Sequence, residues 1–126
     1  MTDRENGIRS WLSAYGQAWE RKETSAFVAL FAPDVHYYWT PFEEPKQGRK
    51  GVAQAFESAV ARQESISFRS TVLLADGRSG LAHWHCSFDR VPGGWRVELD
   101  GIFQMEFDAE GRCRVFREWW HSNEAA

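Results

Sequence analysis

The alternation of apolar and polar residues along 97–121 constrains the fold of this chain more than any other feature of its sequence. Acidic residues and a glycine at 108–111 interrupt the alternation, and such residues tolerate the backbone angles of a tight turn. Two strands joined by a hairpin are therefore predicted, with one apolar face. If the turn sets the register, Gly101 lies opposite Glu118, which is then the single carboxylate on that face.

The earlier part of the chain has apolar residues at helical spacing. We expect an amphipathic helix that ends near Arg21, a short second helix ended by Pro33, a short strand at 35–39 and a third helix at 50–64. From Ile66 the spacing changes to two, and four strands follow as a meander. This order predicts an α+β fold in a single domain over residues 1–126, with the helices covering the apolar face of a curved, mostly antiparallel sheet.

Composition excludes several classes of partner. The net charge is −3, whereas a nucleic-acid partner would require a basic face. No apolar run is long enough to span a bilayer, and the first residues lack the apolar segment of a signal peptide. Cys86 and Cys113 form no CxxC motif, so reduced thiols in a cytoplasmic protein are expected. Aromatic residues make up 15% of the chain, enough for a large core or for the walls of a pocket.

Several segments resemble the NTF2-like superfamily, and more narrowly its SnoaL-like members. The segments that carry the resemblance are Phe31-Ala32-Pro33-Asp34-Val35, Gly48, Leu99-Asp100-Gly101-Ile102-Phe103, Gly111-Arg112 and Arg117-Glu118-Trp119-Trp120-His121. The resemblance implies a cone, with three N-terminal helices on the concave face of a curved sheet, a ligand pocket between them and a homodimer. The superfamily includes isomerases, cyclases, epoxide hydrolases, dehydratases and binding proteins, so the fold alone does not settle the function.

Ketosteroid isomerase, a member of this superfamily, is a residue-by-residue test of the resemblance. Its oxyanion-binding tyrosine is matched by Tyr15. Its general-base aspartate falls at Trp39 or Thr40, and its second oxyanion donor falls near Phe103. Two of the three groups are missing, so we do not expect a steroid isomerase.

Glu118 and Tyr15 are the candidate catalytic residues. A carboxyl group in an apolar cavity has a raised pKa and can serve as a general acid or base at neutral pH. The alternative is that Glu118 lies at the open rim or pairs with an arginine such as Arg114. Tyr15 lies on the buried face of the first helix, where its hydroxyl could bind a ligand or simply bond to a neighbour in the core.

Large aromatic side chains on the inner faces of the predicted elements could form the wall of a pocket for a flat apolar ligand. Packing in the core alone explains each ring, and for any single ring it is the favoured interpretation. The candidate pocket residues are Trp19, Tyr37, Trp39, Trp84, Phe103, Phe116 and Trp120.

His83 and His85 share one strand face, as metal ligands often do. The predicted register puts His85 opposite Asp100 and Arg117 diagonal to Asp100, on the face away from the helices. No later histidine segment completes a ligand set, so we expect a polar or dimer-facing network and no metal. Asp100 is assigned to this network in preference to catalysis.

These features lead to one expected function and one alternative. The expected function is binding of a small, largely apolar, aromatic or cyclic molecule. Any chemistry would be proton transfer without a cofactor, as in an isomerase, cyclase, dehydratase or hydrolase, with Glu118 moving the proton and Tyr15 holding a developing oxyanion. The alternative is a non-catalytic ligand-binding or dimeric interaction module. An open cavity shared by Glu118 and Tyr15 favours the enzyme, and a packed interior favours the module.

Overall fold

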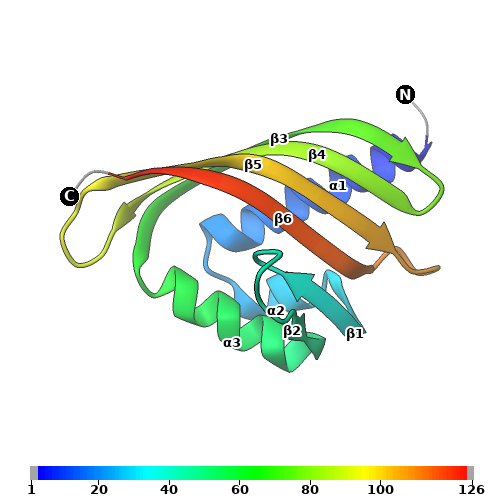
Figure 1. Cartoon of the computed structure of the whole chain (residues 1–126), viewed down its shortest axis with the longest axis horizontal. Helices are drawn as coiled ribbons and strands as arrows, with labels where there is room; N and C mark the ends of the chain where they lie inside the picture. The colour runs from blue at the N-terminus through cyan, green and yellow to red at the C-terminus, as the bar shows by residue number, and fades with distance from the viewer. Residues whose placement is uncertain (1–2, 125–126) are drawn as a thin grey trace.

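The computed structural model of the chain describes residues 3–124 and shows one curved sheet with helices on its concave side (Figure 1). The elements are α1 (Asp3–Glu20), α2 (Thr24–Val28), β1 (Phe31–Tyr38), β2 (Lys46–Gln47), α3 (Gly48–Val60), β3 (Gln63–Asp76), β4 (Ser79–Arg90), β5 (Arg96–Phe107) and β6 (Cys113–Glu124). The six strands lie in the order β2-β1-β6-β5-β4-β3. All neighbouring strands are antiparallel except β1 and β6, which are parallel. The mixed α+β class predicted from the sequence is confirmed.

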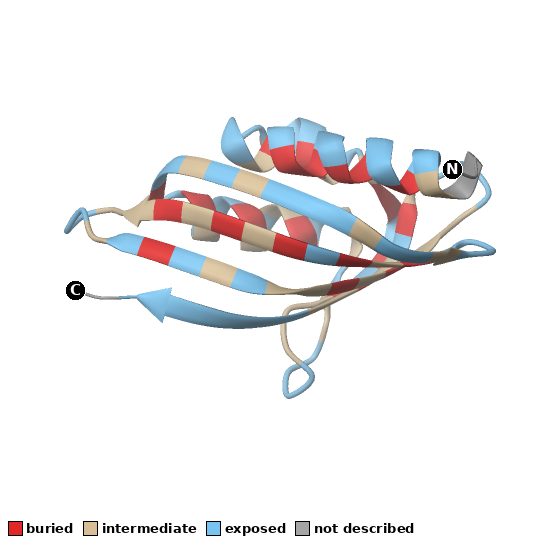
Figure 2. Cartoon of the chain, turned by 90° about the horizontal axis from the view of Figure 1, so that it is seen from above, coloured by how far each residue is buried: buried red, intermediate tan, exposed pale blue. Residues whose placement is uncertain are grey.

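The helices occupy two levels beneath the sheet. Helix α1 packs against β3. Helix α3 lies farther from the long strands of the sheet, and its main contacts are with α2 and β1 (Figure 1). Helix α3 follows β1 and β2 in the chain, so it does not belong to an N-terminal helical block. Buried and less buried segments alternate along the strands, as expected when only one face of a sheet is covered (Figure 2). None of the described helices is both long and apolar enough to cross a bilayer.

Stacked aromatic rings fill the space between α1 and the sheet. The rings of Trp84 and Phe103 lie almost parallel with centres 4.7 Å apart, and those of Tyr37 and Phe116 are 4.5 Å apart. Such ring pairs add to the free energy gained by burying their area. Both cysteines are buried, free thiols.

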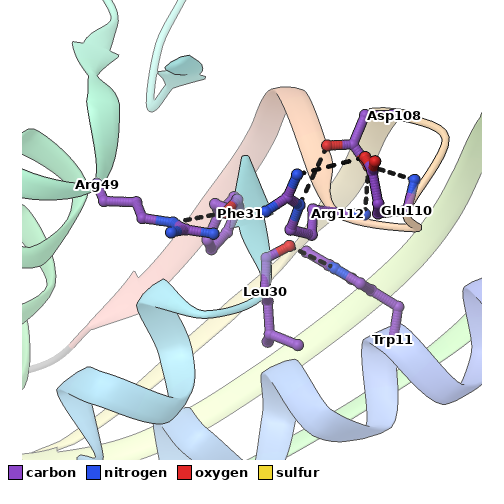
Figure 3. Close-up of polar contacts among 7 residues, drawn as sticks. All are labelled: Trp11, Leu30, Phe31, Arg49, Asp108, Glu110 and Arg112. Atoms are coloured by element: carbon purple, nitrogen blue, oxygen red, sulfur yellow. Dashed lines mark hydrogen bonds and ion pairs between the residues drawn. The ribbon is translucent and has the colours of Figure 1, made fainter. Parts of the chain in front are cut away.

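Two side chains attach the start of β1 to the helices. Trp11 in α1 donates its indole N–H to the Leu30 carbonyl at 2.9 Å, and Arg49 in α3 donates its Nε–H to the Phe31 carbonyl at 2.9 Å (Figure 3). The second helix was predicted to continue to Pro33, but it ends at Val28, and the chain enters β1 after it. Pro33 lies inside β1, in the stretch where the pairing of β1 with β6 is irregular, so its missing N–H is tolerated.

The predicted register of β5 and β6 is wrong by two residues. Glu118 lies opposite Phe103, and Gly101 lies opposite Trp120. The connecting loop contains five residues, 108–112, and one further residue bulges where the ladder begins. The Asp108 carboxylate holds this loop by accepting the backbone N–H groups of Glu110 and Arg112, each at 2.9 Å (Figure 3). Because a shift of two preserves the face of every side chain, Glu118 still points to the concave side.

The other predicted registers are confirmed in part. Trp84 lies opposite Gly101, and His85 lies opposite Asp100, as expected. Val72 is not beside Trp84, because the turn and a bulge after Val72 each shift β3 by one residue and Ser70 takes that place.

The predicted third helix extends too far at its C-terminal end. Helix α3 ends at Val60, and Gln63 is the first residue of β3. The predicted loop at 40–48 contains the short strand β2, which pairs with β1.

Gly101 provides the first test of this architecture. A Cβ atom at this position would collide with the backbone carbonyl of Trp119 in β6. Gly101→Ala is therefore expected to lower the free energy of unfolding by about 1–3 kcal/mol, because backbone atoms cannot move aside as a side chain does. Urea denaturation monitored by tryptophan fluorescence measures this change.

The matched control is Gly7→Ala on the exposed side of α1, where no atom lies within 4 Å of an added Cβ. This variant should gain about 0.5–1 kcal/mol, because alanine favours the helix. Equal stability of the Gly101 variant and the wild type would contradict the close approach of β6.

Candidate functional site

A cavity of about 150 Å³ lies between α3 and the concave face of the sheet. Its walls are mostly aromatic and aliphatic, with a few polar groups. The lining residues are Tyr15, Trp19, Phe27, Tyr37, Trp39, Lys46, Val52, Ala55, Phe56, Ala59, Val60, Gln63, Trp84, Leu99, Glu118 and Trp120.

A chain of three hydrogen-bonding groups faces this cavity. The hydroxyl oxygens of Tyr15 and Tyr37 are 2.8 Å apart, and Tyr37 donates its hydroxyl to Glu118 Oε2 at 2.7 Å. The parallel pairing of β1 and β6 makes the second bond possible, since Tyr37 lies beside Phe116 and Glu118 comes two residues later on the same face. The chain therefore connects α1, β1 and β6.

Among residues 3–124 no cation forms an ion pair with Glu118. Burial raises the pKa of the Glu118 carboxyl to about 8, and the hydrogen bond from Tyr37 opposes this rise. The group is therefore mostly protonated at neutral pH yet close enough to its pKa to give up the proton. Oε1 has no hydrogen-bond partner in the described part of the chain, so it is the oxygen that can exchange a proton with a ligand.

Tyr15 and Tyr37 stay neutral. Burial, followed by the nearby charge of Glu118, raises the pKa of both hydroxyls well above the usual value of 10.0. Each hydroxyl has one hydrogen to donate. When Glu118 is ionised, Tyr37 donates to Glu118 and Tyr15 donates to Tyr37. When Glu118 is protonated, Tyr37 can instead donate to Tyr15, which leaves the Tyr15 hydrogen available.

Tryptophan N–H groups form the other polar contacts of the cavity. Trp19 donates its indole N–H to Gln63 Oε1 at 2.8 Å, and Trp120 donates to the Trp39 carbonyl at 3.2 Å. The indole nitrogen of Trp84 is buried and has no partner among residues 3–124.

Most of the aromatic residues predicted for the pocket lie on the cavity wall. These are Trp19, Tyr37, Trp39, Trp84 and Trp120. Phe103 and Phe116 do not line the cavity and are fully buried. The Tyr15 ring packs over both of them, with ring centres 5.4 and 5.5 Å away, and separates them from the open space.

Sequence reasoning missed one whole wall of the cavity. The apolar side of α3 was expected from its spacing, but nothing in the spacing distinguishes a helix that closes a cavity from one that packs on a core. Gln63 was placed in this helix and not in β3. Lys46 gave no signal, because a strand of two residues cannot be recognised in a loop rich in proline.

The predicted histidine network lies on the outer face of the sheet. His83 Nε2 is 2.9 Å from Asp100 Oδ1, and His85 Nδ1 is 3.3 Å from Asp100 Oδ2. These bonds hold the pKa of the Asp100 carboxyl below its usual value. Among the described residues no group of three or more His, Cys, Asp or Glu side chains is arranged to hold a metal ion. Arg117 is not part of the network, because its guanidinium lies over the Tyr38 ring.

Comparison with known proteins matches the SnoaL-like domain family over residues 12–116. Among solved structures, the epoxide hydrolase/cyclase-like enzyme SalBIII, of pyran ring formation in salinomycin, superposes with a TM-score of 0.84 at 16% identity, covering 99% of this chain and 100% of its own. A designed 17-OHP binder gives 0.82 at 14%, and Δ5-3-ketosteroid isomerase from Mycobacterium sp. gives 0.79 at 13%, each covering 94% of this chain and 98% of its own. A search of curated proteins finds no match.

The raised pKa of Glu118 makes the stability of the protein depend on pH. The folded protein keeps the Glu118 proton up to about pH 8, whereas the unfolded chain releases it near the ordinary value of 4.5. The contribution of Glu118 to stability therefore falls as pH rises between these values, by at most about 1.4 kcal/mol per pH unit. Glu118→Gln removes this loss, so its stability relative to the wild type should increase from pH 5 to pH 8 and level off above.

Urea denaturation of both proteins from pH 5 to pH 9 measures the difference. Glu57→Gln, on the exposed side of α3, is the control and should follow the wild type. A constant difference between the Glu118 variant and the wild type over this range would show that the carboxyl is not held protonated.

Proposed function

The chain belongs to the SnoaL-like domain family, and on this premise we propose that it binds a small, largely apolar cyclic molecule and transfers a proton on it without a cofactor. The observation that carries the proposal is the chain Tyr15–Tyr37–Glu118, which faces an apolar cavity. The free Oε1 of Glu118 is the acid or base, and Tyr15 supports the oxygen of the ligand.

The proton balance of the chain suggests an order of events. Protonated Glu118 donates from Oε1 to a carbonyl, hydroxyl or epoxide oxygen of the ligand, while the free Tyr15 hydrogen bonds to the same oxygen. The Tyr37 hydroxyl then changes its acceptor and donates its hydrogen to the new Glu118 carboxylate. The carboxylate next removes a proton from a neighbouring carbon of the ligand, which restores the starting state of Glu118. Two such transfers amount to an isomerisation, or to a dehydration if the protonated oxygen leaves.

The similar structures support this class of reaction without identifying the substrate. Two of them are an isomerase and an epoxide hydrolase/cyclase-like enzyme, and both share this fold. The cavity volume is comparable to one that holds a benzene-sized molecule, so a single ring would fit inside it.

Binding without turnover is the second candidate function. The designed 17-OHP binder has the same fold. The closed hydroxyl chain also favours this alternative, because it satisfies Tyr15 and Tyr37 without a ligand. A binding module would hold the same ligands in the same cavity but leave them unchanged.

We also propose a cytoplasmic homodimer that associates through the outer face of the sheet. Ile102 and Trp119 lie opposite each other on this face, and Trp119 is 44% exposed. Trp119→Lys should convert the dimer into a monomer in sedimentation equilibrium, because a charge would replace apolar contact area. Phe42→Lys, at a 93% exposed position in the loop after β1, is the control and should stay dimeric. A monomeric wild type would refute the dimer.

A panel of monocyclic epoxides, β,γ-unsaturated ketones and tertiary alcohols tests the proposed activity, with products identified by gas chromatography. At least one compound should be converted, and Glu118→Gln should reduce kcat by about 10²–10⁴-fold, because the amide cannot transfer the proton. Glu57→Gln is the control and should keep the wild-type rate. Compounds that bind but are not converted would favour the binding module, and an unchanged rate in Glu118→Gln would remove this residue from the mechanism.

A further inference from the structure

Helix α3 connects the two edge strands of the sheet. One polar residue that lines the cavity lies beyond each end of this helix. Lys46 lies in the edge strand β2, two residues before the helix, and Gln63 begins the opposite edge strand β3. The 13 residues of α3 correspond to a helix of about 20 Å. Both residues line the cavity, and the apolar side of α3 lies between them.

The Lys46 end of the cavity carries a positive charge that no carboxylate neutralises. Lys46 is the only cation among the lining residues, and no ion pair joins it to another described residue. Its ammonium lies 5.3 Å from the centre of the Trp39 ring, at the mouth of the cavity. Burial raises the pKa of Glu118 and the hydrogen bond from Tyr37 lowers it, whereas no cation contributes to the shift. The Lys46 ammonium is therefore not the counter-ion of that carboxyl.

The Gln63 end of the cavity offers hydrogen-bond donors without acceptors. Gln63 Oε1 accepts the Trp19 N–H, and the amide nitrogen of Gln63 has no partner among the described residues. The centre of the Trp84 ring lies 6.1 Å from that of Trp19, the side chain is 1% exposed, and its indole N–H also lacks a partner among the described residues. A buried donor without an acceptor costs free energy that a ligand oxygen can recover.

We propose that the natural ligand is a monocyclic carboxylic acid, bound with its carboxylate at Lys46 and with an oxygen on its ring, other than the one that reacts at Glu118, at Gln63 and Trp84. This inference rests on the proposed function and names the substrate class for the same cavity. The charge pattern carries it: one fixed cation at the mouth, neutral hydrogen-bond donors at the far end and apolar walls between. A neutral ligand would leave the half-buried ammonium without an anionic partner, and an organic cation would be repelled by it.

The test compares matched probes by nuclear magnetic resonance of the tryptophan indole N–H groups. The probes are 4-oxocyclohexyl carboxylic acids with arms of two to six carbons, the corresponding amides, and cyclohexyl acids that lack the ring oxygen. The signals of Trp19, Trp39, Trp84 and Trp120 report the cavity, whereas those of Trp11 and Trp95 report other parts of the protein. The variants are Lys46→Gln and, as a matched control, Lys50→Gln on the exposed side of α3.

The wild type and Lys50→Gln should bind the best oxo-acid at least fivefold more tightly than its amide, and added NaCl should weaken the binding of the acid. Lys46→Gln should remove this preference while its amide affinity stays within twofold. In the wild type the oxo-acid should move the Trp84 signal more than the acid without the ring oxygen does. This comparison needs no substitution in the core.

Two results would overturn the proposal and leave the proposed function standing: equal affinity for acid and amide at the cavity tryptophans, or a preference for acid that survives in Lys46→Gln. An unresponsive Trp84 signal would overturn the assignment of the ring oxygen. Shifts confined to Trp11 and Trp95, or no shifts with any probe, would overturn the proposal together with the proposed binding site.

Discussion

The structure places one partly buried carboxyl group, that of Glu118, where its hydrogen-bond partner among residues 3–124 is a tyrosine hydroxyl. Glu118 lies on the apolar face of β6, and Tyr37 gives it a single hydrogen bond. A buried carboxylate without a cation is costly, so the folded protein favours the protonated form. Tyr15 extends the chain into α1 and thereby fixes the helix, the parallel strand β1 and β6 around one titrating group. The same contacts that limit the cost of burial also hold the group at the cavity wall.

The apolar cavity and the hydrogen-bonded chain arise from different parts of the fold. The aromatic layer between α1 and the sheet is fully packed, and Tyr15 covers Phe103 and Phe116 at its border. Helix α3 closes the remaining space from below without filling it. The cavity therefore lies where the packed layer ends, and Glu118 is at that boundary. This position explains how a carboxyl can be desolvated by the core and still line the cavity.

Side-chain alternation predicted the faces of β4, β5 and β6 correctly, because the period of two survives a turn error of two residues. In β3 a bulge after Val72 reverses the alternation, so Leu74 is exposed and not on the covered face. The error in the β5–β6 register came from a five-residue loop and a bulge, which together shift the pairing by two and leave Glu118 on the concave face. Alternation could not distinguish Trp84, which lines the cavity, from Phe103, which Tyr15 covers. The period shows which face of the sheet a side chain is on, but not how deeply a helix buries it. Lys46 and the partner of Glu118 could not be found either, because both depend on strand neighbours that are distant in the chain.

The attachment of α3 at both ends determines how a molecule can reach the interior. The helix is continuous with β2 at one end, and only residues 61–62 separate it from β3 at the other. It therefore cannot swing outward as a flap about a single hinge. Trp120 is 45% exposed beside Trp39, and the loop after Trp39 carries the 93% exposed Phe42. Of the residues that line the cavity only Trp120 is exposed, so the cavity wall meets solvent at the Trp120 indole and not at α3.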